Sequence, residues 1–194
     1  METALFLGHG SPMNVLHDNA YNRAFRQIGD SLPIPRAILC ISAHGYGNGI
    51  RVGSSPRPGL VYDFYGFPDA LYQQQYPVSG CPELAEEICR LLPHDRPDPE
   101  MGLDHGAWTV LKPMFPRADI PVVPLSLDAT PGSAEHFALA KRLRPLREQG
   151  VLIVGSGNIV HNLRVYRPDA PPHQWAQAFR LGINSASLTA SPIT

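Results

Sequence analysis

Three histidines in this chain stand just past apolar, strand-like runs. They are His9, His44 and His161, and glycine flanks His9 on both sides and follows His44. In an open α/β sheet the carboxyl ends of the strands line one crevice, so residues far apart in sequence meet there. Imidazoles that meet in a crevice indicate a transition-metal site or acid–base chemistry.

Each of these histidines also has a purely structural explanation, which is a hydrogen bond to backbone at a strand end. The glycines argue against it for His9 and His44, because glycine lets a backbone turn sharply or a ligand come close. His161 follows a tight Gly-Ser-Gly-Asn turn that lacks the spacing and the lysine of a phosphate-binding loop. His105 opens a helix, and a helix N-terminus disfavours the imidazolium and suits a neutral base or hydrogen donor. The other histidines are predicted to be solvated, namely His17, His94, His136 and His173.

Length and charge limit the class of protein. The 194 residues can bury one sizeable core, and one domain is the simplest count. The formal net charge of −1 gives no strong field for nucleic acid or an anionic membrane. We expect neither a secretory leader nor a membrane span, since no apolar run is long enough. Cys40, Cys81 and Cys89 lack metal-ligand spacing and indicate a reducing cytoplasm.

Strand-like runs alternate with helical patterns along the chain. Residues 54–80 have no helical period and form a connection long enough to be functional. Residues 93–99 are predicted to be a second loop, and Pro145 predicts an early end or a kink in the helix that contains it. The remaining predictions are strands at 4–7, 37–41, 50–53, 121–127 and from 151, with helices at 21–31, 82–92, 106–115, 130–149 and 171–181.

This alternation predicts parallel strands joined by crossover helices. Near-continuous apolar strands such as 37–41 agree, because parallel sheets are buried on both faces. We therefore expect one α/β domain with a mostly parallel or mixed central sheet and helices on both faces. His9, His44 and His161 should converge at one end of that sheet. Nothing in the sequence indicates an oligomeric state.

Five short motifs follow one another in a recognisable order. Together they resemble the class III extradiol ring-cleavage dioxygenases, and within them the DOPA 4,5-dioxygenase branch, over residues 3 to about 180. By this likeness Asp63-Phe64 and Phe67-Pro68 belong to a substrate-pocket loop. The motifs are Gly-His-Gly-Ser-Pro-Met (8–13), Ser-Ala-His (42–44), Tyr-Asp-Phe-Tyr-Gly-Phe-Pro (62–68), Leu-Asp-His-Gly-Ala-Trp (103–108) and Gly-Asn-Ile-Val-His-Asn-Leu (157–163).

The resemblance implies a non-haem Fe(II) enzyme that opens the ring of a small aromatic diol, a DOPA-like catechol, with O₂. His9 and His44 match the first two metal ligands of the family. His161 matches a histidine at the metal, either a third ligand or a base. His105 matches a pocket histidine, so the catalytic acid–base work falls to His105 or His161. Zn(II) suits the same imidazoles and is expected as an alternative occupant in purified protein.

Two other functions are compatible with these residues. One is a zinc-dependent hydrolase, because three imidazoles and a water generate hydroxide near neutral pH. The other is a non-catalytic metal-binding protein of the same fold. Residues 182–194 are polar and do not resemble the family. We therefore expect a catalytic domain over 1–181, incomplete at its C-terminal end, and an atypical, weakly structured tail over 182–194.

Overall fold

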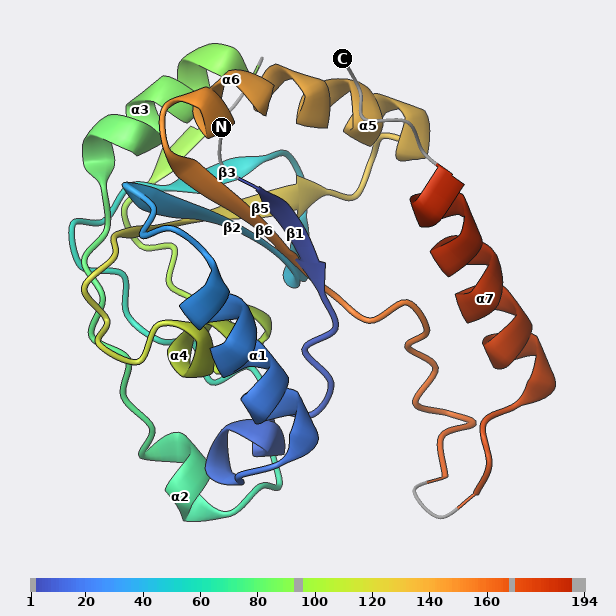
Figure 1. Cartoon of the computed structure of the whole chain (residues 1–194). Helices are drawn as coiled ribbons and strands as arrows, with labels where there is room; N and C mark the ends of the chain where they lie inside the picture. Colours follow the sequence, from blue (N-terminus) through green and yellow to red (C-terminus); the bar gives the residue numbers. More distant parts are fainter. Residues whose placement is uncertain (1–2, 93–95, 168–169, 190–194) are drawn as a thin grey trace. The chain divides into compact units, whose positions relative to one another are not determined.

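A six-stranded sheet forms the centre of the protein, in the strand order β1-β6-β2-β5-β3-β4 (Figure 1). Neighbouring strands are parallel except for β3 and β5, which pair antiparallel, so the sheet is mixed. The strands are β1 (Ala4–Leu7), β2 (Ala37–Gly47), β3 (Arg51–Gly53), β4 (Arg96–Asp98), β5 (Val122–Asp128) and β6 (Val151–Ser156). The computed structural model describes residues 3–92, 96–167 and 170–189, with side chains as far as residue 185.

Two hydrophobic clusters cover the two faces of the sheet, because side chains alternate along each strand. On β2, Ile38 and Cys40 belong to one cluster, whereas Ala37 and Leu39 belong to the other. Figure 1 shows α1 (Ala20–Ser31) and α4 (His105–Met114) on one side of the sheet. It shows α3 (Pro82–Leu91), α5 (Ser133–Arg142) and α6 (Arg144–Glu148) on the other side. The predicted fold class is confirmed, with helices on both faces of a mixed sheet.

The helices begin where the sequence supplies caps and prolines. Asn19 accepts a hydrogen bond from the backbone N–H of Asn22 at the start of α1, and Asp104 accepts one from Ala107 at the start of α4. The predicted break near Pro145 is confirmed, since α5 ends before it and α6 begins with Pro in its first turn.

Several short elements lie where the sequence predicted none. A 3₁₀ helix, η1 (Pro12–Leu16), precedes α1, and the long connection contains the single-turn helix α2 (Asp69–Tyr72). Strand β4 lies within the predicted loop over 93–99, and β2 extends to Gly47. Such short segments carry too few residues for a period to be recognised. His94 and the rest of 93–95 lie outside the described residues.

The contacts divide the chain into two units, Met1–Gly157 and Asn158–Thr194, and each is described by itself. The second unit contains His161 in a loop, followed by α7 (Gln174–Thr189). The prediction of a weakly structured tail is wrong over 182–189, because these residues continue α7 without an interrupting proline. The predicted boundary between 181 and 182 stays a prediction. Within the described ranges, no helix has the length and apolar character needed to cross a membrane.

Candidate metal centre

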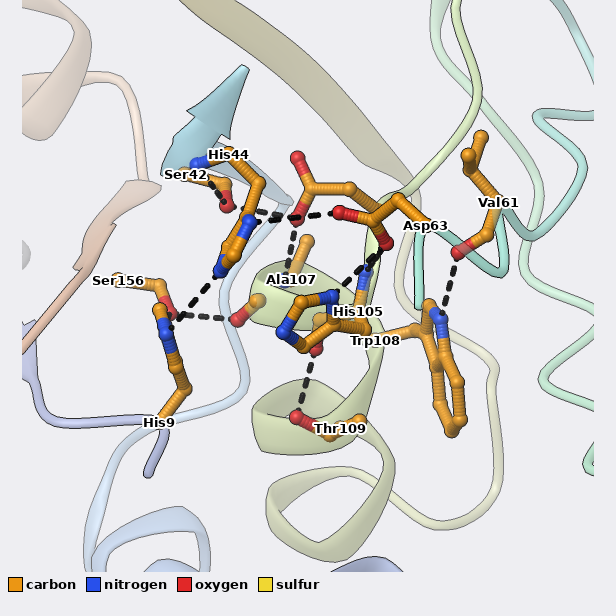
Figure 2. A network of polar contacts seen from close by, with 12 residues as sticks. His9, Ser42, His44, Val61, Asp63, His105, Ala107, Trp108, Thr109 and Ser156 are labelled. Carbon is orange, nitrogen blue, oxygen red and sulfur yellow. Dashed lines mark hydrogen bonds and ion pairs between the residues drawn. The ribbon is translucent and has the colours of Figure 1, made fainter. Parts of the chain in front are cut away.

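Three imidazoles meet at the carboxyl ends of the central strands, and Figure 2 shows them around one point. His9 follows β1, His44 lies on the irregular end of β2, and His105 is the first residue of α4. The pairing of β2 with β5 shifts register between Ile41 and Tyr46, the kind of irregularity that re-aims a side chain. One potential ligand atom from each imidazole lies within 4.8 Å of the others.

A buried serine fixes the orientation of His9. Ser156, at the end of β6, donates a short hydrogen bond to the backbone carbonyl of Gly106. A hydroxyl has one proton, so its oxygen must accept the 3.0 Å hydrogen bond that joins it to His9 Nδ1. His9 Nδ1 therefore carries the ring proton, and Nε2 presents its lone pair to the cluster. His9 and Ser156 are each only 2% exposed, so this arrangement is shielded from water.

A single carboxylate, that of Asp63, touches the other two imidazoles (Figure 2). Its Oδ1 lies 2.8 Å from His105 Nδ1 and accepts a further hydrogen bond of 2.9 Å from the His105 backbone N–H. Its Oδ2 lies 3.4 Å from His44 Nδ1. Burial alone would raise the pKa of Asp63, but the hydrogen bonds from His105 outweigh it and lower the pKa below its ordinary value.

The distance between the facing nitrogens of His9 and His44 fits one shared metal ion. Their Nε2 atoms are 3.3 Å apart. Two nitrogens about 2.1 Å from one ion at a tetrahedral angle would be about 3.4 Å apart. Each ring has an oxygen near its Nδ1 atom, Ser156 Oγ for His9 and Asp63 Oδ2 for His44, while the two Nε2 atoms face each other. A divalent cation could take the place between the two Nε2 atoms, so the residues fit a transition metal.

The backbone around His44 is held by a second aspartate. Ser42 donates a 2.6 Å hydrogen bond to Asp104 Oδ1 and accepts one of 3.2 Å from the His44 backbone N–H. Burial raises the pKa of Asp104 above its ordinary value, although the Ser42 hydrogen bond opposes this. Gly106 has no room for a side chain here, because a Cβ would lie 2.5 Å from Ser42 Oγ and 3.0 Å from His44 Cδ2.

Aromatic side chains form a wall beside His105. The ring of Phe64 lies edge-on to the His105 ring, with centroids 5.6 Å apart. Phe64 in turn packs against four further rings, whose centroids are 5.2 to 6.4 Å away. These rings belong to Tyr62, Phe67, Tyr72 and Trp108. The wall supplies a flat apolar surface next to polar imidazoles, which suits an aromatic ring that carries hydroxyl groups.

The structure brings together His9 and His44, which the sequence predicted as ligands, and His105, which it predicted as an acid–base residue. His161 lies in the second unit and is exposed in its loop. Sequence reasoning missed the contacts of Ser156 with His9 and gave Asp63 no role at the imidazoles. Two motifs could have pointed to these residues. Asp63 lies inside the motif at 62–68, and Ser156 lies directly before the motif at 157–163.

The histidines predicted to be solvated have different environments. His17 and His173 are exposed, as predicted. The prediction is wrong for His136, whose Nε2 is buried. His136 sits on α5, and its Nδ1 lies 3.1 Å from the Gly132 carbonyl, so the ring folds back onto its own helix.

Fold and site together define a class of protein, an α/β enzyme-like domain with a three-histidine cluster that could hold a metal ion beside an aromatic wall. Residues 3–182 match the family described as the catalytic LigB subunit of aromatic ring-opening dioxygenase. The chain belongs to this family of extradiol ring-opening dioxygenases. The resemblance seen in the sequence motifs is thereby confirmed.

Individual relatives agree with this assignment. The chain is 46% identical over 181 residues to a 4,5-DOPA dioxygenase extradiol of Escherichia coli K12, covering 91% of this chain and 67% of the relative. It is 36% identical over 200 residues to a 4,5-DOPA dioxygenase extradiol of Beta vulgaris, covering 98% and 75%. The crystal structure of an uncharacterized protein from Escherichia coli K12 superimposes with a TM-score of 0.83 at 40% identity, covering 97% of this chain and 74% of that one.

Proposed function

We propose that this chain opens the ring of a DOPA-like catechol by extradiol cleavage with Fe(II) and O₂. The observation that carries the proposal is the pair of converging Nε2 atoms of His9 and His44, 3.3 Å apart, with His105 and an aromatic wall beside them. Membership in a ring-opening dioxygenase family supports the reaction type. The printed names of the bacterial and plant relatives support DOPA as the first substrate to test.

His9 and His44 would hold the iron through Nε2, and His161 would be the third ligand or a neighbouring base. A bound divalent iron would supply Lewis acidity and open positions for a diol and for O₂. Zn(II) would fit the same nitrogens, and its content in purified protein should be measured alongside iron.

His105 would carry the acid–base work at the substrate. Its Nδ1 proton is directed at Asp63, so Nε2 keeps a lone pair that can accept a phenolic proton. The Asp63 carboxylate would then stabilise the imidazolium that forms, as an acidic partner does for a catalytic histidine. His105 is only 7% exposed, so this proton would pass between substrate and imidazole without competition from bulk water.

Oxygen uptake tests the proposal directly. The protein is loaded anaerobically with Fe(II), and O₂ consumption and semialdehyde absorbance are followed with DOPA and a panel of other catechols. His105→Ala should retain iron while the rate of ring opening falls about 10²–10⁴-fold, the usual contribution of a general base. His17→Ala is the matched control, because His17 is exposed and its side chain lies outside the cluster.

The same experiment separates the two alternative functions. Fully iron-loaded protein that consumes no O₂ with any catechol would refute the proposal, and hydrolysis that requires Zn(II) would favour the hydrolase. The catalytic domain over 1–181 remains a proposal, as does a tail over 182–194. The cytoplasmic location also stays a prediction.

A further inference from the structure

The long connection between β3 and α3 is held on one side of α4. The backbone N–H at the start of the helix donates to the Asp63 carboxylate at 2.9 Å. One turn further on, Trp108 donates its indole N–H to the Val61 carbonyl at 3.3 Å, as Figure 2 shows. Lys112, another turn along, donates to Gln74 Oε1 at 2.7 Å. Residues three and four apart share one side of a helix, and all of α4 except Lys112 is buried, so these donors belong to a rigid support.

Gln74 is fixed by neighbours from two helices. Its side-chain Nε2 donates to the Ala70 carbonyl at 3.0 Å, while its Oε1 accepts from Lys112. Leu71, just before it in the chain, is fully buried in the core. The Gln74 backbone carbonyl accepts a 2.7 Å hydrogen bond from the Tyr62 hydroxyl. The acceptor of this hydrogen bond therefore has a fixed position, and the Tyr62 ring is held by it.

The Tyr62 ring belongs to the layer of side chains that supports Phe64. Its centroid lies 6.1 Å from that of Phe64 and 5.9 Å from that of Trp108. The Tyr72 ring, 6.3 Å from Tyr62, contacts Phe64 as well, at 5.2 Å. Phe64 is the ring that lies edge-on to His105, with centroids 5.6 Å apart. A shift of Tyr62 would therefore move the apolar surface next to the imidazoles.

Both ends of the aromatic wall are anchored as well. At its start, the Val61 backbone N–H donates to the carbonyl of the fully buried Leu103 at 2.7 Å. Beyond Phe64 the chain reverses at Gly66, whose φ of 75° favours glycine. The reversal brings the Phe67 ring edge-on to the Phe64 ring, with centroids 5.4 Å apart. The wall is therefore held in place without a bound molecule.

We propose that Tyr62 is a positioning residue whose hydroxyl keeps Phe64 beside His105, as a preformed surface for the aromatic ring of the substrate. The wall is then a fixed part of the pocket and not a lid that closes after binding. This inference rests on the function proposed above, which makes the substrate a catechol. Because the side chains are already ordered, a catechol binds without the entropic cost of ordering them. Tyr62 acts through Phe64, so its loss should change substrate binding more than the chemical step.

A second tyrosine provides a matched control for this hydroxyl. The Tyr76 hydroxyl lies 3.3 Å from the Leu111 carbonyl and 3.2 Å from the Phe115 carbonyl, and Tyr76 is 2% exposed. It holds the C-terminal end of α4, whereas Tyr62 holds the wall. A change of either tyrosine to phenylalanine removes a hydrogen bond from a phenol to a backbone carbonyl and keeps the ring. Only the change at Tyr62 should affect catechol binding.

Catechol binding tests the proposal without turnover, by calorimetric titration of DOPA into Zn(II)-loaded protein. Tyr62→Phe should weaken DOPA binding about 3–10-fold, the effect of one hydrogen bond. In iron-loaded protein KM should rise by the same factor, while kcat stays within about twofold, as for a residue that contributes uniform binding. Tyr76→Phe should keep the DOPA affinity of the wild type. Wild-type affinity in Tyr62→Phe would overturn the proposal, and so would an equal loss in Tyr76→Phe, which would indicate a general effect of stability.

Amide hydrogen exchange in metal-free protein gives a readout that is independent of catalysis. Tyr62→Phe should speed the exchange of the Val61 and Gln74 amides by about threefold or more, because the wall opens more often without the hydroxyl. Tyr76→Phe should leave both amides near their wild-type rates. Unchanged exchange in Tyr62→Phe would contradict the positioning role.

Lys112→Met tests the same contacts from the other end, and it decides the question if Tyr62→Phe does not fold. It removes the side-chain donor to Gln74 and so loosens the carbonyl that accepts from Tyr62. DOPA affinity should therefore fall here too, and Lys112→Met that binds DOPA as tightly as the wild type would overturn the proposal. Wild-type protein that binds DOPA but takes up no O₂ would instead refute only the proposed function.

Discussion

Ser156→Ala should weaken both the fold and the metal centre. The Ser156 hydroxyl donates to the Gly106 carbonyl and accepts from His9 Nδ1 at 3.0 Å, and both residues of the latter pair are 2% exposed. Removing the hydroxyl deletes one hydrogen bond, at about 0.5–1.5 kcal/mol, and leaves the His9 N–H buried without its acceptor, at about 1–3 kcal/mol. The expected loss in the free energy of unfolding is therefore roughly 1.5–4.5 kcal/mol.

Ser156→Ala should also weaken metal binding, because the His9 ring loses the acceptor that fixes its proton on Nδ1. Without an acceptor at Nδ1, His9 can place its proton on Nε2, the atom that faces His44. Zn(II) affinity should fall about 10–100-fold, as for other residues that support a ligand. Urea unfolding of metal-free protein measures the first effect, and titration with Zn(II) measures the second.

Ser126→Ala is the matched control for this prediction. Ser126 is also buried, at 1% exposure, and its hydroxyl accepts a 2.8 Å hydrogen bond from the Arg51 backbone N–H rather than from an imidazole. It should lower stability by about 1–3 kcal/mol and leave metal affinity within about twofold. If Ser156→Ala binds Zn(II) as tightly as the wild type, the tautomer reasoning for His9 is refuted, whatever its stability.

Three further outcomes are expected. His9→Ala should abolish stoichiometric metal in elemental analysis, and unchanged metal content would remove His9 from the site. Gly106→Ala should displace His44, since the new Cβ would lie 3.0 Å from the His44 ring, and a lower metal affinity than wild type in the same titration checks it. Cys40 is buried, and this burial, with the nearby charge of Asp104, raises the pKa of its thiol, so thiolate stays scarce at neutral pH. It should resist thiol reagents in folded protein and react on unfolding, and rapid labelling of Cys40 in the native state would contradict this.

Sequence predicted the regular elements well because their patterns are local. The apolar run at the start of β2 and the proline between α5 and α6 are signals that neighbours in the chain supply. Strand β3 was predicted too, but its antiparallel pairing with β5 rests on one residue pair, Val52 with Leu125, which no local pattern specifies. The end of α7 was not predicted either. The helix runs past the predicted boundary at 181 because no proline in 182–189 interrupts it.

The site was predicted in part for the same reason. His9 and His44 could be predicted because each comes at the end of a local apolar run that forms a strand. Their partners were not, because they come from distant segments: Ser156 lies 147 residues after His9, and His105 lies 42 residues after Asp63. The register of β6 against β1 and β2 places Ser156 opposite Leu7 and Ser42, and that register is a property of the sheet. Its consequence at the site could not be predicted from spacing.

The strand order also determines which parts of the sheet can form first while the chain is being synthesised. The first strand in sequence, β1, pairs in the described sheet with the last one, β6, which inserts between β1 and β2. On the ribosome β1 has to wait for residues 151–156 before it can be incorporated, and contacts of such long sequence separation slow folding. Until then the ladder of β2 and β5 can form while His9 lacks its serine. The histidine cluster is thus one of the last parts of the domain to assemble, and a metal ion bound there would report a finished fold.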